Sequence, residues 1–316
     1  MSKLGNEKEI ELNGSFGVAH LLIGEVGATL HQYYYITPEG DRVDITMPYG
    51  DQIAPASCGC ILAPWPNRIE DGKYSFEGKD YQLPITEIWS NNASHGLVFY
   101  QNWNLEIEEN RIIGRLNLPP TKGYPFEVNF TVVYSLEIRN NDNKEFPSLG
   151  VKFIAENTGS ENAPFGLAFH PYFSTRNFLS TEAVLTLKAE SKVSTTDRLL
   201  PNGVEKVIGT DFDLSSESKS LGERVFDTAF VDVELDKDNK AHVLLKTPDN
   251  AKTDIWGDST FKSFQVFTAS SLKGFENAVA VEPQTCYANA FNTGDLLLTL
   301  KPNQQYVGEW GLDFSK

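Results

Sequence analysis

The sequence has few cysteines and no long apolar run. Its 316 residues include three cysteines, and an odd number does not predict a disulfide framework. The Cys58-Gly59-Cys60 spacing is too short for the usual zinc or thioredoxin motifs, so no structural metal is expected. No segment approaches the ~18 consecutive apolar residues of a membrane span, and the polar N-terminus lacks the apolar core of a signal peptide. These absences predict a soluble, cytoplasmic protein.

Positive charge is also scarce. Lysine and arginine number 27 against 43 aspartates and glutamates, which gives a formal net charge of −16. Such a chain would repel a phosphate backbone, and no basic run offsets this, so we expect no nucleic-acid partner and no membrane partner. The same acidity disfavours anionic ligands, although one local arginine can override a global field. A small, neutral, polar ligand is the simplest expectation.

Period-two alternation dominates the sequence and predicts an all-β fold. It is clearest at residues 128–137 and recurs at 149–156 and 306–312. Further strands are expected over residues 183–188, 241–246, 263–268, 278–281 and 296–300. Turn signals such as Asp71-Gly72 and Pro201-Asn202-Gly203 separate such runs, and no long amphipathic helix interrupts them. We therefore predict a single domain, residues 1–316, built as a large antiparallel twisted β-sandwich.

One histidine and one glutamate stand out because each follows an apolar run and precedes a proline. His170 lies in the apolar and aromatic segment 165–173, and Glu282 follows the expected strand 278–281. Pro283 cannot donate a ladder hydrogen bond, so it predicts that this strand ends beside Glu282. Either residue alone fits a structural role, as a core histidine or a solvated glutamate. If they converge, imidazole and carboxylate form an acid–base pair that works near neutral pH without a metal.

Several short segments, in the same order and over most of the chain, resemble the aldose 1-epimerase (mutarotase) family. They are Pro66-Asn67-Arg68-Ile69, residues 71–78, Ser94-His95-Gly96, Gly123-Tyr124-Pro125-Phe126, residues 169–173 and Val281-Glu282-Pro283. Each segment is short, but the ordered set is hard to obtain by chance. The family's fold is a galactose mutarotase-like β-sandwich with an open sugar cleft, which agrees with the alternation.

The resemblance implies an isomerase that interconverts the α and β anomers of a free aldohexose such as glucose or galactose. By resemblance, Glu282 takes the proton from the anomeric hydroxyl while His170 protonates the ring oxygen. The ring opens, the C1–C2 bond rotates, and closure gives the other anomer. The same resemblance places further side chains against the sugar, namely Arg68, His95, Asp227, Asn67, Tyr172 and Gln265.

Some assignments stay open at this point. Asp232 replaces Asp227 if the alignment slips, and His20, His31 and His242 match nothing in the family and are interpreted as structural or surface residues. No cofactor is expected, and the protein is expected to be a monomer or a homodimer.

Two alternatives to a free-sugar mutarotase remain. A hexose-6-phosphate 1-epimerase needs additional cations to meet the phosphate, and Arg176, close after Tyr172, is the candidate. A carbohydrate-binding or regulatory protein would keep the fold without the reaction. Leu97 follows Gly96 where many galactose-acting members have another glycine, so the loops around the sugar are expected to differ.

Overall fold

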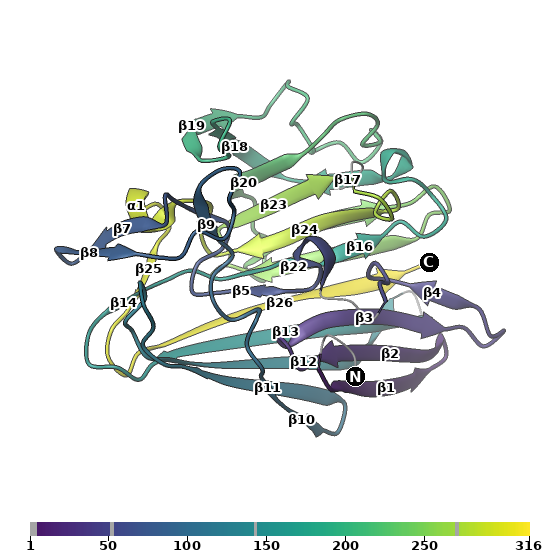
Figure 1. The fold of residues 1–316 in the computed structure, drawn as a ribbon. Coiled ribbons are helices and arrows are strands. Elements are labelled where there is room, and N and C mark those ends of the chain that lie inside the picture. Colours follow the sequence, from purple (N-terminus) through teal and green to yellow (C-terminus); the bar gives the residue numbers. More distant parts are fainter. Residues whose placement is uncertain (1–4, 51–53, 142–143, 269–271) are drawn as a thin grey trace.

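The structure is a computed structural model that describes residues 5–50, 54–141, 144–268 and 272–316. These residues form antiparallel sheets almost throughout, as Figure 1 shows. The predicted all-β fold is therefore confirmed. Among the described residues, no helix is long and apolar enough to cross a membrane.

One large sheet has eight strands in the order β10-β11-β12-β13-β26-β22-β21-β17. In chain order they are β10 (Asn104–Glu108), β11 (Arg111–Leu118), β12 (Val128–Asn141), β13 (Lys144–Asn157), β17 (Val184–Leu187), β21 (Lys240–Lys246), β22 (Lys252–Asp258) and β26 (Gln305–Ser315). The clearest alternation in the sequence, at residues 128–137, lies in β12.

The second large sheet has the order β19-β18-β20-β23-β24-β15-β5, and β16 also pairs with β24. In chain order its strands are β5 (Ile61–Leu62), β15 (Ala168–Phe169), β16 (Tyr172–Ser174), β18 (Ala189–Thr195), β19 (Pro201–Lys206), β20 (Asp227–Val233), β23 (Ser263–Thr268) and β24 (Ala278–Gln284). This sheet carries the His170 and Glu282 segments.

Smaller elements complete the fold. The four-stranded N-terminal sheet comprises β1 (Glu7–Gly14), β2 (Gly17–Gly24), β3 (Thr29–Ile36) and β4 (Arg42–Asp44). Three two-stranded ladders pair β6 (Arg68–Glu70) with β9 (Asn92–Ser94), β7 (Lys73–Phe76) with β8 (Lys79–Gln82), and β14 (Ala163–Phe165) with β25 (Leu298–Leu300). The helical elements described are short, namely η1 (Pro55–Ser57), η2 (Ser180–Glu182) and α1 (Ala290–Thr293).

The core between the sheets is built from the apolar face of each strand. On β12 the buried residues are the alternate positions that the sequence pattern predicted, namely Val128, Phe130, Val132, Tyr134 and Leu136. Phe153 of β13 contacts Phe169 of β15 with ring centroids 5.9 Å apart, and Phe169 also contacts Trp310 of β26 at 5.2 Å. Buried aromatic pairs of this kind dominate core energetics. They fix β15, and with it His170, against the large sheet.

Two expectations based on proline are wrong. Pro283 does not end its strand, because β24 continues to Gln284 and both Glu282 and Pro283 pair with β23. The ladder on the other side of β24 is interrupted between β15 and β16, and a residue without an N–H is tolerated beside such a break. Pro201 likewise begins β19 rather than a turn. Because β19 lies at the edge of its sheet, its first residue can be proline.

Replacing Phe153 with alanine tests the packing of the two sheets. Its side chain is fully buried, so Phe153→Ala removes an aromatic contact and leaves a cavity that costs about 3–5 kcal/mol of unfolding free energy. Chemical denaturation measures this loss. The matched control is Lys152→Ala, on the neighbouring, solvent-facing position of the same strand, which should change stability by less than about 0.5 kcal/mol. Equal effects of the two substitutions would contradict the described packing.

Candidate active site

His170 and Glu282 are brought together by the register of the second large sheet. Ala168, two residues before His170, faces Gln284, two residues after Glu282. The same antiparallel register places His170 opposite Glu282, and side chains directly opposite each other share one face of a sheet. Accordingly, Nε2 of His170 lies 3.3 Å from Oε1 of Glu282. Both side chains are buried.

The backbone and ring of His170 are held from the β5 side and from β16. Its N–H donates to the carbonyl of Cys60 at 3.0 Å, and its own carbonyl accepts from the N–H of Gly59 at 2.9 Å. The imidazole stacks on the Tyr172 ring, with centroids 5.2 Å apart and an interplanar angle of 16°. The Tyr172 hydroxyl donates to the carbonyl of Ala56 at 3.1 Å. Tyr172 is therefore a support beneath His170.

Amide side chains continue the row of polar groups across the sheet. Gln284 donates from Nε2 to Oε2 of Glu282 at 3.2 Å. On the other side of β24, Gln265 pairs with Glu282 in the β23 ladder and donates from Nε2 to Oδ1 of Asp227 at 2.5 Å. Adjacent strands thus bring imidazole, two carboxyl groups and two amides close together. Gln284 was not among the residues predicted from the sequence.

The short β6–β9 ladder brings Arg68 and His95 close to these residues of the second large sheet. Arg68 of β6 pairs with Ser94, the residue before His95, and its Nη1 donates to Oδ1 of Asn67 at 3.0 Å. The ring of His95 lies edge-on to that of His170, with centroids 5.8 Å apart. Asn67 and Arg68 line a small cavity of about 20 Å³ together with several residues of the second large sheet.

The structure places the eight residues predicted from the sequence in two connected groups. Four line the small cavity, namely Asn67, Arg68, Asp227 and Gln265. His170 forms a contact group with the others, namely Glu282, His95 and Tyr172. Glu282 joins the two groups because it pairs with Gln265 in the ladder.

Burial sets the protonation of the central pair. It lowers the pKa of His170 to about 3, an effect to which the nearby His95 adds, and with Arg68 it lowers the pKa of His95 to about 3. Burial, reinforced by the negative charge of Asp227, raises the pKa of Glu282 well above its usual value. A low-dielectric site disfavours every isolated charge. Both shifts favour the uncharged form of the pair, with a neutral imidazole on His170 and the proton on the carboxyl group of Glu282.

Sequence reasoning also missed the partner of Arg68. Glu87, in the loop before β9, accepts from Nε of Arg68 at 2.6 Å and from Nη2 at 2.8 Å. Trp89 of the same loop lies with its ring centroid 5.9 Å from the Arg68 guanidinium carbon. No local pattern in the sequence marks either residue, because their importance comes only from contact with Arg68.

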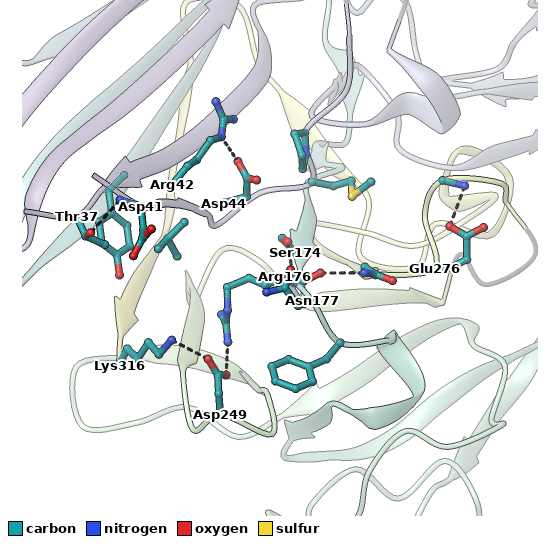
Figure 2. Close-up of a pocket in the computed structure, with 17 residues that line it drawn as sticks. Thr37, Asp41, Arg42, Asp44, Ser174, Arg176, Asn177, Asp249, Glu276 and Lys316 are labelled. Atoms are coloured by element: carbon teal, nitrogen blue, oxygen red, sulfur yellow. Dashed lines mark hydrogen bonds and ion pairs between the residues drawn. The ribbon is translucent and has the colours of Figure 1, made fainter. Parts of the chain in front are cut away.

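Arg176 lines a cavity to which none of the eight predicted site residues contributes. That cavity, of about 730 Å³, is lined by the ends of β3 and β16, by β4 and by Lys316 (Figure 2). Nη2 of Arg176 donates to Oδ1 of Asp249 at 2.5 Å, and Lys316 binds the other oxygen of the same carboxylate at 2.8 Å. Both cations are therefore already paired with an acid. Asp232, the substitute considered for Asp227, also lines a separate cavity.

The three histidines interpreted as structural pair with acids away from this site. His20 contacts Glu9 and Glu11, His31 contacts Glu7, and His242 contacts Asp236 and Asp254. Cys58, Cys60 and Cys286 are buried, free thiols.

The all-β sandwich thus places a buried imidazole–carboxyl pair beside guanidinium, amide and carboxylate groups. The sequence profile of the aldose 1-epimerase family matches residues 12–312. The chain therefore belongs to the aldose 1-epimerase family and is an isomerase of that type.

Curated relatives agree with this membership, and a solved structure shares the fold. The chain is 30% identical over 301 residues to the uncharacterized Escherichia coli protein YihR, covering 93% of this chain and 91% of that protein. It is 29% identical over 163 residues to the galactose mutarotase of Rattus norvegicus, covering 49% of this chain and 44% of the mutarotase. An aldose epimerase homologue from C. elegans has the same fold, with a TM-score of 0.82 at 20% identity over 98% of this chain and 99% of that one.

Histidine titrations test the burial of the site. Because burial lowers the pKa of His170 to about 3, its imidazole should stay neutral between about pH 8 and about pH 5, where an exposed histidine becomes protonated. His242 is the internal control, because hydrogen bonding to Asp254 raises its pKa and it should become charged earlier as the pH falls. Long-range ¹H–¹⁵N NMR of the imidazoles measures both. Protonation of His170 in step with an exposed histidine would contradict the described burial.

Proposed function

We propose that the chain interconverts the α and β anomers of an uncharged aldohexose of the glucose or galactose type, with His170 and Glu282 as the proton-transfer pair. The observation that carries the proposal is the 3.3 Å approach of Nε2 of His170 to Oε1 of Glu282. Family membership supplies the class of reaction.

Mutarotation removes one proton from the sugar and adds one proton to it, so the sugar neither gains nor loses protons overall. One group removes the proton from the anomeric hydroxyl, the C1–O5 bond breaks as the C1 carbonyl forms, and the other group protonates the ring oxygen. After rotation about C1–C2, the same transfers run backwards and close the ring on the other face. A pair that shares one proton supplies an acid and a base together.

The roles follow from where that proton lies when the sugar reacts. In the form with Glu282 ionised and His170 protonated, Glu282 is the base and His170 is the acid. This form differs from the neutral pair only by movement of one proton. Gln284, by donating to the carboxylate at 3.2 Å, lowers the cost of ionising Glu282, and Arg68 acts in the same direction.

Arg68, Asn67, Gln265 and Asp227 are proposed to bind the sugar. The amides and the guanidinium donate hydrogen bonds and the carboxylate accepts them, which matches the hydroxyl groups of a pyranose. His95, whose buried Nδ1 has no hydrogen-bond partner among the described residues, is proposed to help hold the ring oxygen.

The two alternatives gain no support from the site. A hexose-6-phosphate epimerase was considered because of Arg176, but that side chain binds Asp249 in a separate cavity. A binding protein without activity would not need both proton-transfer groups 3.3 Å apart.

Substitution of either group tests the reaction and the roles. His170→Asn or Glu282→Gln should lower the rate constant kcat for glucose or galactose mutarotation by about 10²–10⁴-fold, the usual contribution of a positioned acid or base. Polarimetry of freshly dissolved α-anomer measures this rate. The control is His242→Asn, on β21 and paired with Asp236 and Asp254, which should keep wild-type activity. Full activity in both site variants would overturn the proposed roles.

A further inference from the structure

We propose that Glu87 is a specificity-determining residue, which fixes the Arg68 guanidinium and cancels its charge so that the site prefers uncharged sugars over sugars bearing an anionic group. This inference rests on the proposed function of the same site. It assigns a role to a residue outside the segments that resemble the family.

The first support is the geometry of the ion pair. Nε and Nη2 of Arg68 donate to the two carboxylate oxygens of Glu87 at 2.6 and 2.8 Å. Their side chains are 12% and 18% exposed. A two-pronged pair of this kind fixes the plane of the guanidinium as well as its position. Burial weakens the screening that would otherwise make an ion pair negligible.

The Glu87 carboxylate is itself held in place. The N–H of Glu87 donates to the carbonyl of Asn92 at 3.0 Å, and the N–H of Asn92 donates to the carbonyl of Glu87 at 3.2 Å. The Ser90 hydroxyl donates to Oε2 of the Glu87 carboxylate. Burial alone would raise the pKa of Glu87, but the bonds from Arg68 and Ser90 outweigh it and keep that pKa below its usual value. Glu87 is therefore ionised at neutral pH and carries a full negative charge.

The second support is the count of donors left for a ligand. A guanidinium has five N–H groups, and Arg68 uses three of them, two on Glu87 and one on Asn67. One N–H on each terminal nitrogen remains, which suits hydroxyl oxygens. Binding a phosphate or carboxylate through the Nε and Nη2 edge of the guanidinium would require Arg68 to leave Glu87.

The third support is the charge around the cavity. Arg68 is the one cation among the described residues that line it, and Asp227 is also there as an acid. Arg198, on the neighbouring turn, is bound to Asp71 at 2.7 Å and to Glu70 at 3.2 Å. With Glu87 opposing Arg68, the surroundings are net negative. An anionic sugar would meet repulsion, and like charges placed together across a binding site are costly.

Glu87→Gln is the decisive variant, because it keeps the shape of the side chain and removes its charge. NMR exchange spectroscopy measures anomer exchange for glucose and for glucose 6-phosphate under the same conditions. For the wild-type protein, we expect kcat/KM to be higher for glucose than for glucose 6-phosphate. In Glu87→Gln the ratio of glucose 6-phosphate to glucose kcat/KM should rise by about tenfold, mainly through a lower KM for the phosphate.

Glu70→Gln is the matched control, since it removes one negative charge from the same region without touching Arg68, and it should leave the ratio unchanged. Ser90→Ala is a second test variant that loosens the Glu87 carboxylate. It should shift the ratio in the same direction as Glu87→Gln by a smaller factor. Thermal melting establishes that each variant is folded.

The outcomes separate this inference from the function on which it rests. A wild-type protein that accelerates neither sugar overturns the proposed function. A wild-type protein that turns over glucose, with a ratio that stays the same in both Glu87→Gln and Ser90→Ala, overturns only the role of Glu87. A wild-type preference for glucose 6-phosphate over glucose also overturns the role of Glu87. A rise in the ratio for Glu70→Gln equal to that for Glu87→Gln would reduce the effect to general charge and overturn the specific role.

Discussion

The candidate site depends on placing an imidazole and a carboxyl group side by side in the interior of a sheet. An isolated buried charge is expensive, so His170 and Glu282 are stable there because the pair can be neutral and Gln284 donates to the carboxyl group. The cross-strand register supplies the geometry. A shift by one residue would turn Glu282 to the other face and separate the two groups.

The packing between the two large sheets holds that register. Phe169, the residue before His170, points to the opposite face because side chains alternate along a strand, and there it contacts Phe153 and Trp310. One short segment therefore anchors the core with one side chain and presents the imidazole with the next. This explains how β15, with only two residues, can be a fixed part of the site.

Much of the fold follows from local pattern, because a strand between core and solvent must alternate. The run in β12 and its buried face are read directly from the sequence. Family-like segments also predicted that His170 and Glu282 belong to one site, 112 positions apart in the sequence. The proline expectations failed for a physical reason, since tolerance of Pro283 depends on an interrupted ladder on the neighbouring strand. Glu87 could not be recognised from the sequence as a site residue, because the role proposed for it depends on its contact with Arg68, which only the fold creates.

The position of Glu87 has a consequence for how such a protein can change over time. Glu282 lies in β24 and His170 directly follows β15, which pairs with β24, whereas the partner of Arg68 belongs to a surface turn closed by Asn92. Turns accept substitutions that a packed sheet does not. The role proposed for Glu87 would therefore let ligand preference diverge between descendants through a few changes in that turn, while the strands that hold His170 and Glu282 stay unchanged.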